Sequence, residues 1–261
     1  MKKNRLHIAL LICLIVCGIV FVALHVPACV RYIQTAKLIV AIGNDRVDTV
    51  RTMLESGVTP NMPDGPYRGL WKYINGFVEH APRCPLSIAC EKGNLEMVKL
   101  LLDYDADPAF TEQEGFNWSA LSSAILYSKN EHSLEIVALL IENGADIESD
   151  NDGWPPFELA CMAYISPDQE TEERNAHAQR VVEIAKLVKG NYDLNPWGTI
   201  TPLMKAALNN NHLLVEYLLS IGADPNIQLS DGRTAYNFAN NAGHEEVAAI
   251  LKNAMKANGS E

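Results

Sequence analysis

The stretch T-P-L-M-K-A-A-L-N-N-N-H-L-L-V-E-Y-L-L-S-I-G-A-D-P-N, residues 201–226, decides how this chain folds. It predicts a short helix opening at Thr201, a tight turn, a second helix over Leu213–Ser220 and an exit at a glycine. The pattern returns 33 residues later, where Tyr236 takes the place of Leu203. A fixed period of this size is the mark of a solenoid, in which each unit packs on its neighbours.

The same register appears in earlier parts of the chain. Each full copy has a large apolar opening residue, followed three residues later by alanine. The opening residues are Leu86, Leu121, Phe157, Leu203 and Tyr236, and the alanines are Ala89, Ala124, Ala160, Ala206 and Ala239. Stacked helix pairs can approach closely there only if the side chain is small. With a shorter copy in front, built from helices over Thr35–Ile42 and Val47–Glu55, the pattern predicts six all-α units.

Each second helix is predicted to end at a residue with left-handed backbone. Gly57, Gly144 and Gly222 adopt that conformation without strain. Asp105 and Asn191 hold the corresponding points elsewhere, and short polar side chains are the ones that best tolerate it.

These motifs resemble those of the ankyrin repeat. Cys84-Pro85-Leu86-Ser87-Ile88-Ala89 is similar to its opening motif, and Gly222-Ala223-Asp224-Pro225-Asn226 to its exit. The resemblance covers roughly residues 35–254 and leaves 255–261 as a C-terminal tail. It implies an ankyrin-repeat solenoid that binds other proteins through hairpin tips and the faces of its first helices.

Residues 1–34 form a different kind of segment. Three basic residues lie within Met1–Arg5, and Ile8–Leu24 is a run of 17 residues without charge. As a helix it would be about 25 Å long, close to the thickness of a bilayer core. We predict an uncleaved signal-anchor helix over residues 6–26, with its basic end in the cytoplasm. The repeats would then lie outside the cytoplasm, in the periplasm if the source is a bacterium.

Two alternatives remain open for this segment. The sequence Val26-Pro27-Ala28-Cys29 resembles a bacterial lipoprotein processing site, with Cys29 as the lipidated residue, although the proline departs from that pattern. Simple cleavage after Ala28 is the other.

The period is broken by insertions near residues 62–81 and 163–178 and by a longer turn around Ser128–Ser133. Insertions of this kind map to loops, often on a working face. The first insertion contains Trp71 and Tyr73, which we predict to belong to a binding surface. The second is acidic, and a solvated helix face is the simpler interpretation.

Composition excludes several kinds of function. A net charge of −11 repels phosphate backbones, so nucleic acid is not expected as a partner. A partner protein with a basic face would explain the acidity, and so would solubility alone. Cys90 and Cys161 occupy equivalent positions two units apart, about 20 Å at about 10 Å per layer, so we predict buried thiols. No motif for a metal, a cofactor or catalysis is found, so we predict a non-enzymatic protein without a small-molecule substrate.

One column of residues is the predicted contact surface. It lies three residues before each opening position, at the exposed hairpin tip of the family: Arg83, Trp118, Trp154, Ile200 and Arg233. Trp and Arg are enriched at interface hot spots. The alternative is that Trp118 and Trp154 fold over the adjacent repeat and belong to the core. Tyr127, Lys92 and Asn209, on the first-helix side, extend this surface in our interpretation.

The resulting hypothesis is a membrane-anchored module that captures a protein in the extracytoplasmic space. Its resemblance to bacterial ankyrin proteins that neutralise secreted toxins suggests an immunity role, by analogy of fold alone. The alternative is a structural scaffold of an envelope membrane complex.

Overall fold

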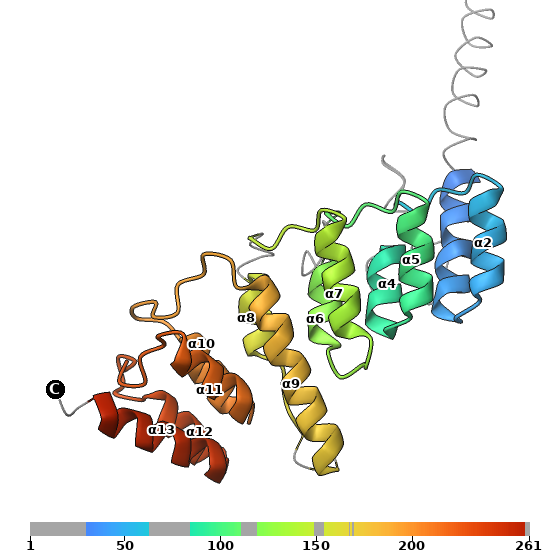
Figure 1. The fold of residues 1–261 in the computed structure, drawn as a ribbon. Helices are drawn as coiled ribbons and strands as arrows, with labels where there is room; N and C mark the ends of the chain where they lie inside the picture. The colour runs from blue at the N-terminus through green and yellow to red at the C-terminus, as the bar shows by residue number, and fades with distance from the viewer. Residues whose placement is uncertain are drawn as a thin grey trace, which may run out of the picture.

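The computed structural model describes residues 30–62, 84–110, 119–148, 154–166, 168 and 170–258. Within these ranges the chain forms six helix pairs, numbered here as repeats one to six (Figure 1). Repeat one joins a helix over residues 30–43 to α2 (Val47–Glu55). The other pairs are α4 (Pro85–Lys92) with α5 (Leu95–Asp103), α6 (Ala120–Leu126) with α7 (Ser133–Glu142), α8 (Pro156–Cys161) with α9 (Thr171–Val188), α10 (Pro202–Leu208) with α11 (His212–Ser220), and α12 (Ala235–Asn241) with α13 (Glu245–Asn258). The predicted all-α fold is confirmed.

The pairs stack in two layers. The first helices α4, α6, α8, α10 and α12 follow one another, and so do the second helices α2, α5, α7, α9, α11 and α13 (Figure 1). Long connections between repeats lie along one edge of the stack, called here the hairpin edge. The tight turns within each pair lie along the opposite edge, called here the turn edge.

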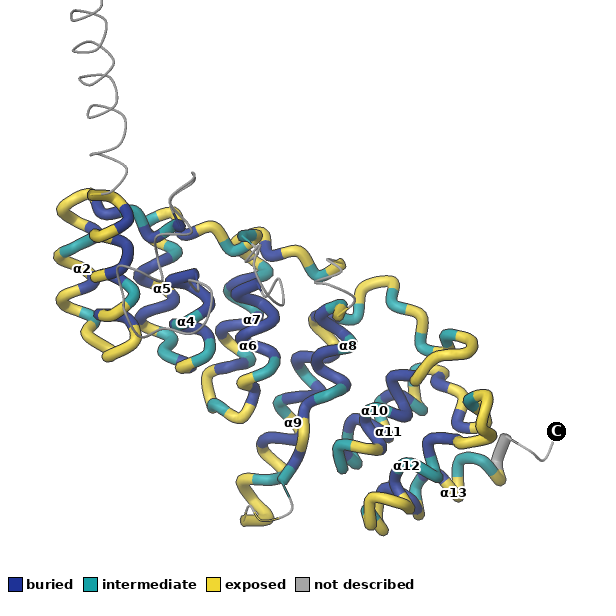
Figure 2. Tube along the Cα trace, turned by 180° about the vertical axis from the view of Figure 1, so that it is seen from behind, coloured by how far each residue is buried: buried dark blue, intermediate teal, exposed yellow. Residues whose placement is uncertain are grey.

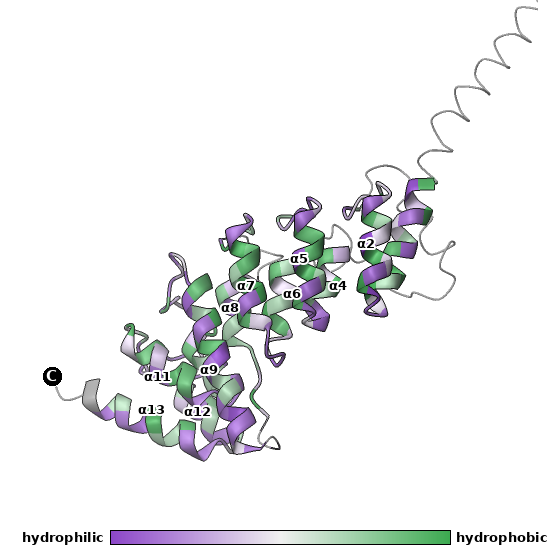
Figure 3. Ribbon diagram, turned by 45° about the vertical axis from the view of Figure 1, so that its right-hand side comes forward, coloured by the Kyte–Doolittle hydropathy of each residue, from purple (hydrophilic) through white to green (hydrophobic). Residues whose placement is uncertain are grey.

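The core runs between the layers through the whole row (Figure 2). All five predicted alanines are buried, as are four of the five opening residues, and the fifth, Tyr236, is half-buried. Apolar residues therefore face inward along the stack while the connecting edges are polar (Figure 3). Close packing explains the alanines, because a larger side chain would push adjacent first helices apart.

Local sequence sets where the helices begin. Asn94 is the N-cap of α5, and its side-chain oxygen accepts a hydrogen bond of 3.0 Å from the Met97 amide. Asn211 caps α11 in the same way, and Thr201 caps α10. Such caps satisfy amides that have no partner in the first helical turn.

The predicted left-handed exits are confirmed at four of five positions. Gly57, Gly144, Gly222 and Asp105 have φ of 90°, 95°, 97° and 61°. The prediction for Asn191 is wrong, because Gly190 (φ 46°) takes that role instead. The second helix α9 ends at Val188, so the turn is completed one residue earlier than the repeat spacing implies.

Asparagine side chains join neighbouring exits along the hairpin edge. The Asn61 amide donates to the Asp105 carbonyl and its oxygen accepts from the Asp107 amide, both at 2.8 Å. Asn195 makes the same two bonds to repeat five, at 3.0 Å and 2.8 Å. Each bond pair fixes one exit loop relative to the next.

The irregular segments have different outcomes. Most of the insertion near 62–81, including Trp71 and Tyr73, lies outside the described residues. In the acidic insertion, Glu172 and Glu173 are exposed in the first turn of α9, where the helix dipole favours negative charge. The rest of the insertion lengthens α9 past the turn edge of its neighbours (Figure 1).

At the front of the chain, the predicted anchor over residues 6–26 and Cys29 lie outside the described residues. None of the helices that the structure describes is long and apolar enough to cross a bilayer. The first described helix reaches back to residue 30, and Tyr32, with 1% of its surface exposed, already belongs to the packed repeats.

Candidate protein-binding surface

The predicted tip column is exposed wherever the structure describes it. Trp154 has 36% of its surface exposed and Ile200 has 44%, and Arg233 is exposed as well. These residues come from the hairpin edge of repeats four, five and six. Arg83 and Trp118, the members from repeats two and three, lie outside the described residues.

Trp197 lies on the same edge, but the prediction from the sequence did not include it. It lies in the loop between α9 and α10, three residues before Ile200, and 94% of its surface is exposed. A tryptophan so little covered makes almost no contribution to the fold, and tryptophan is enriched at interface hot spots. The sequence did carry a signal, because the turn Pro196-Trp197-Gly198 places an aromatic residue at a point with no packing role.

A polar cluster supports the tip from behind. Lys205 on α10 forms an ion pair with Glu158 on α8, and Glu158 also accepts a hydrogen bond of 2.8 Å from the Tyr192 hydroxyl. The Lys205 ammonium lies 5.2 Å from the centre of the Trp154 ring, within cation–π range. The Tyr192 ring in turn lies 5.2 Å from that of Phe157, in the core. Trp154 is thus contacted by repeat five while 36% of its surface remains exposed.

The ion pair in this cluster is poorly solvated. The side chains of Lys205 and Glu158 are only 12% and 15% exposed. Burial lowers the pKa of Lys205 to about 8, so the ammonium remains mostly protonated at neutral pH. Because Lys205 lies on a different repeat from Glu158 and Trp154, it couples the packing of two repeats to the position of the tip.

The three predicted first-helix residues lie at the other edge. Each stands at the end of a first helix, so the length of that helix, about 12 Å at 1.5 Å per residue, separates it from the tips. Tyr127 is 40% exposed. Asn209 is half-buried and its side chain donates to the Lys205 carbonyl. The structure therefore does not bring these residues together with the tip column.

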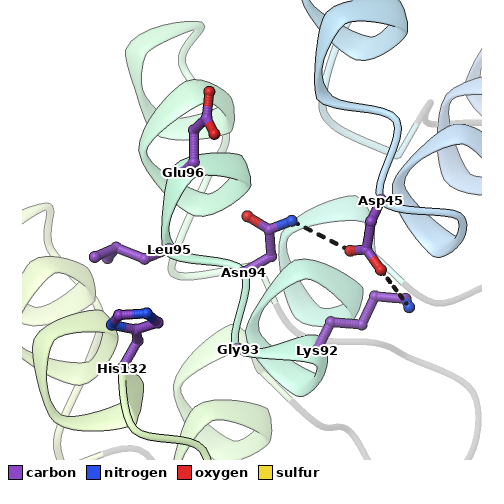
Figure 4. Close-up of a pocket in the computed structure, with 7 residues that line it drawn as sticks. All are labelled: Asp45, Lys92, Gly93, Asn94, Leu95, Glu96 and His132. Atoms are coloured by element: carbon purple, nitrogen blue, oxygen red, sulfur yellow. Dashed lines mark hydrogen bonds and ion pairs between the residues drawn. The ribbon is translucent and has the colours of Figure 1, made fainter.

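Lys92, the third of them, is already engaged. Its ammonium lies 3.0 Å from the Asp45 carboxylate, which also accepts a hydrogen bond of 3.2 Å from Asn94 (Figure 4). These hydrogen bonds lower the pKa of Asp45 against the opposing effect of its burial. The residues line an open hollow of about 540 Å³ together with Glu96 and His132. Lys92 joins repeats one and two.

The prediction that Cys90 and Cys161 are buried thiols is confirmed. Cys90 and Cys161 are buried thiols that form no disulfide in the described part of the chain, and Cys84 is buried as well. Burial raises the pKa of Cys90 and Cys161, which keeps them protonated and unreactive. In the described part of the chain, His, Cys, Asp and Glu form no group of three that could hold a metal ion.

Comparison with known proteins agrees with this architecture. The chain is 31% identical over 159 residues to "Putative palmitoyltransferase ZDHHC13" of Danio rerio, a match that covers 59% of this chain and 22% of that protein. It is 29% identical over 192 residues to "Ankyrin repeat protein nuc-2" of Neurospora crassa, covering 71% of this chain and 16% of that protein. It is 25% identical over 191 residues to "Putative ankyrin repeat protein YahD" of Escherichia coli K12, covering 63% of this chain and 92% of that protein.

These matches differ in how much of the relative they include. The chain spans 22% and 16% of the zebrafish and fungal proteins, so their whole activities do not transfer to it. The zebrafish match runs through ankyrin repeats, which are generally non-enzymatic. Repeats of this family indicate a protein–protein interaction module. A family model described as ankyrin repeats (3 copies) matches residues 71–151 and 175–260, and this chain therefore belongs to the ankyrin-repeat family.

Proposed function

We propose that this chain captures one partner protein through the hairpin edge of repeats four to six. The contact surface consists of Trp154, Trp197, Ile200 and Arg233, and it is called here the tip surface. The observation that carries the proposal is the exposure of Trp197, at 94%, beside two other apolar or aromatic tips. A partner that covered these side chains would remove apolar surface from water at about 25 cal/mol per Å².

The arrangement of the tip surface suits binding rather than folding. Trp154 is held by Lys205, so its ring loses little freedom when a partner covers it. Arg233 is paired with Asp231 at 2.7 Å and stacks over Phe238, which orders the guanidinium in the same way. Predicted hot-spot residues that are already ordered give more affinity than mobile ones.

We also propose that capture takes place outside the cytoplasm, with residues 6–26 as the membrane tether. The support is the uncharged run Ile8–Leu24 behind the basic residues of Met1–Arg5. Neutralisation of a secreted toxin is one form that such capture takes. The net charge of −11 favours a partner with a basic face.

The tip surface is tested by affinity capture from the native envelope fraction. Tagged wild-type chain should retain a discrete partner that the double variant Trp154→Ala/Trp197→Ala loses. Leu187→Ala is the matched control, because Leu187 is a 42% exposed apolar residue on α9, away from the tips. Equal recovery of the partner by all three proteins would contradict the proposal.

The tether is tested separately. A chain lacking residues 1–29 keeps the helix that contains the buried Tyr32, so its repeats should remain folded by circular dichroism. We expect it to leave the membrane fraction and still bind the partner. An envelope scaffold would instead lose its association along with the tether. Alkaline phosphatase fused to the C-terminus of the full chain should be active if the repeats lie outside the cytoplasm.

A further inference from the structure

Two of the breaks in the repeat period meet in space. The longer turn of repeat three, around Ser128, packs against the added length of α9 in repeat four, where the Ser128 hydroxyl lies 3.4 Å from Nε2 of His177. Between them is a hollow of about 250 Å³ at the turn edge, called here the His177 hollow. Leu126 and Ala163 supply its apolar lining, and Ser166 and Lys129 supply polar groups.

His177 is an unusual residue to find there. It is only 5% exposed, and its Nδ1 has no hydrogen-bond partner among the residues that the structure describes. Burial and the charges of Arg180 and Lys129 lower its pKa to about 4, so the ring is neutral at pH 7. Buried polar atoms in native proteins nearly always have partners, so an unmet ring nitrogen beside a hollow points to a missing one.

The protonation of the ring identifies the kind of partner. Nε2 of His177 is the partner recorded for the Ser128 hydroxyl, and with the hydroxyl taken as the donor the ring proton lies on Nδ1. The unmet group is therefore a donor. The buried Nε of Arg174, one turn earlier on α9, also has no partner in the described residues, but Arg174 does not line the hollow.

The surrounding charge narrows the choice further. Lys129, Arg180 and Glu173 are the charged groups that act on the ring, two cations against one anion. This is a locally positive site on a chain whose net charge is −11. Unmet donors under a positive potential favour an acceptor that carries negative charge.

We propose that the His177 hollow receives a carboxylate side chain, a glutamate or aspartate, from the protein that the repeats capture. At about 250 Å³ the hollow is smaller than the roughly 300–1,000 Å³ of small-molecule sites, and a single side chain suits it better. Nδ1 of His177 is itself buried, so the ring must turn towards the hollow before the carboxylate can accept from it, and the same carboxylate pairs with Lys129 at the rim. The captured protein would thus present basic residues to the acidic surface of the repeats and one acidic residue to the His177 hollow.

The source of the carboxylate, a captured protein, rests on the proposed function. The preference of the hollow for a carboxylate is independent of the proposed function. The test therefore uses a small probe. The full chain, labelled with ¹⁵N in its histidine rings, is titrated with N-acetyl-glutamate methylamide and with the uncharged N-acetyl-glutamine methylamide. The His177 signals are assigned by their loss in His177→Gln.

We expect the glutamate probe to shift the His177 ring nitrogens in a saturable way, with millimolar affinity, and the glutamine probe to bind at least tenfold more weakly. Lys129→Met should weaken binding of the glutamate probe about tenfold, because it removes the cation that pairs with the carboxylate. Lys129 is exposed, so its replacement should leave the fold intact. Lys252→Met, an exposed lysine on α13, should change nothing. Equal binding of both probes, no saturable shift with either, or no effect of Lys129→Met would each overturn the proposal, while the tip-surface experiment would stand unaffected.

Discussion

Repeat four meets its two neighbours in contrasting ways. Towards repeat five it offers Glu158, which is joined directly to Lys205 and Tyr192. Towards repeat three it offers His177, whose Nδ1 is buried without a partner in the described residues. The same helix pair thus closes one junction with a satisfied polar cluster and leaves a buried ring nitrogen unmet at the other. The first arrangement is typical of a structural contact and the second of a site that awaits a ligand.

Removal of the cation from the satisfied junction should have the largest effect. Lys205→Met leaves the Glu158 carboxylate in a site where its side chain is 15% exposed, with Tyr192 as its recorded partner. We expect a loss of about 2–3 kcal/mol in the free energy of unfolding, measured by urea denaturation, because a poorly solvated charge loses its counterion.

The double variant Lys205→Met/Glu158→Leu serves as the control for that change. It removes both charges, so most of the lost stability should return, to within about 1 kcal/mol of the wild type. If the double variant were as unstable as the single one, the contribution of Lys205 would be packing rather than charge.

The longer turn of repeat three can be disturbed from repeat two. Gly93 has φ 65°, and a methyl group there would collide with the side chain of Asn130, in the longer turn of repeat three. That side chain donates to the Lys92 carbonyl and accepts from the His132 amide, so moving it breaks both bonds. Gly93→Ala should lower the free energy of unfolding by about 2 kcal/mol.

Gly243→Ala separates backbone strain from crowding in this experiment. Gly243 has φ 77° at the equivalent turn of repeat six, with nothing within 4 Å of an added methyl group. Strain alone should lower its stability by about 1 kcal/mol. Equal losses in the two variants would show that Asn130 does not pack firmly against repeat two.

The unmet imidazole predicts a pH effect. The pKa of His177 is about 4 in the folded chain and about 6.5 when unfolded, so between these values the unfolded chain binds the proton more readily. The free energy of unfolding of the wild type should therefore fall relative to that of His177→Gln as the pH falls from about 6.5 to about 4. Above pH 7 the difference between the two free energies should be constant. Unfolding curves recorded at several pH values give this difference, and parallel pH profiles would show that the ring is not neutral in the fold.

The smallest effect is expected at the tip. Trp197→Ala should change the free energy of unfolding by less than about 0.5 kcal/mol, because the side chain is 94% exposed. Thermal melts of wild type and variant should superimpose. A clear drop in Tm would place the ring in a packing role and remove it from the tip surface.

Sequence reasoning succeeded where the period is intact. The five alanines and their opening residues were found because a repeated register places the same residue at the same packing point. Helix α2 was predicted at its observed bounds, Val47–Glu55, because its apolar face and glycine exit are regular. The error at Asn191 shows the limit, because α9 ends at Val188 and Gly190 takes the left-handed conformation one residue before the position that the register gives.

The functional features were harder to predict for a related reason. Ser128 and His177 are 49 residues apart, and each lies in a segment that departs from the period, so no register places one against the other. The pairing of Lys205 with Glu158 depends on side-chain direction between adjacent first helices, which a repeat pattern leaves open. Trp197 was missed because only one position of each hairpin was compared.

The asparagine bonds along the hairpin edge have a mechanical consequence. In the part of the chain that the structure describes, Asn61 and Asn195 each bond to the following exit loop, and each helix pair packs mainly on its neighbours. A pulling force applied between the two ends of the row would therefore pass through every junction in series. The weakest link would yield first and the others would stay folded, so the row would lengthen in steps rather than break all at once.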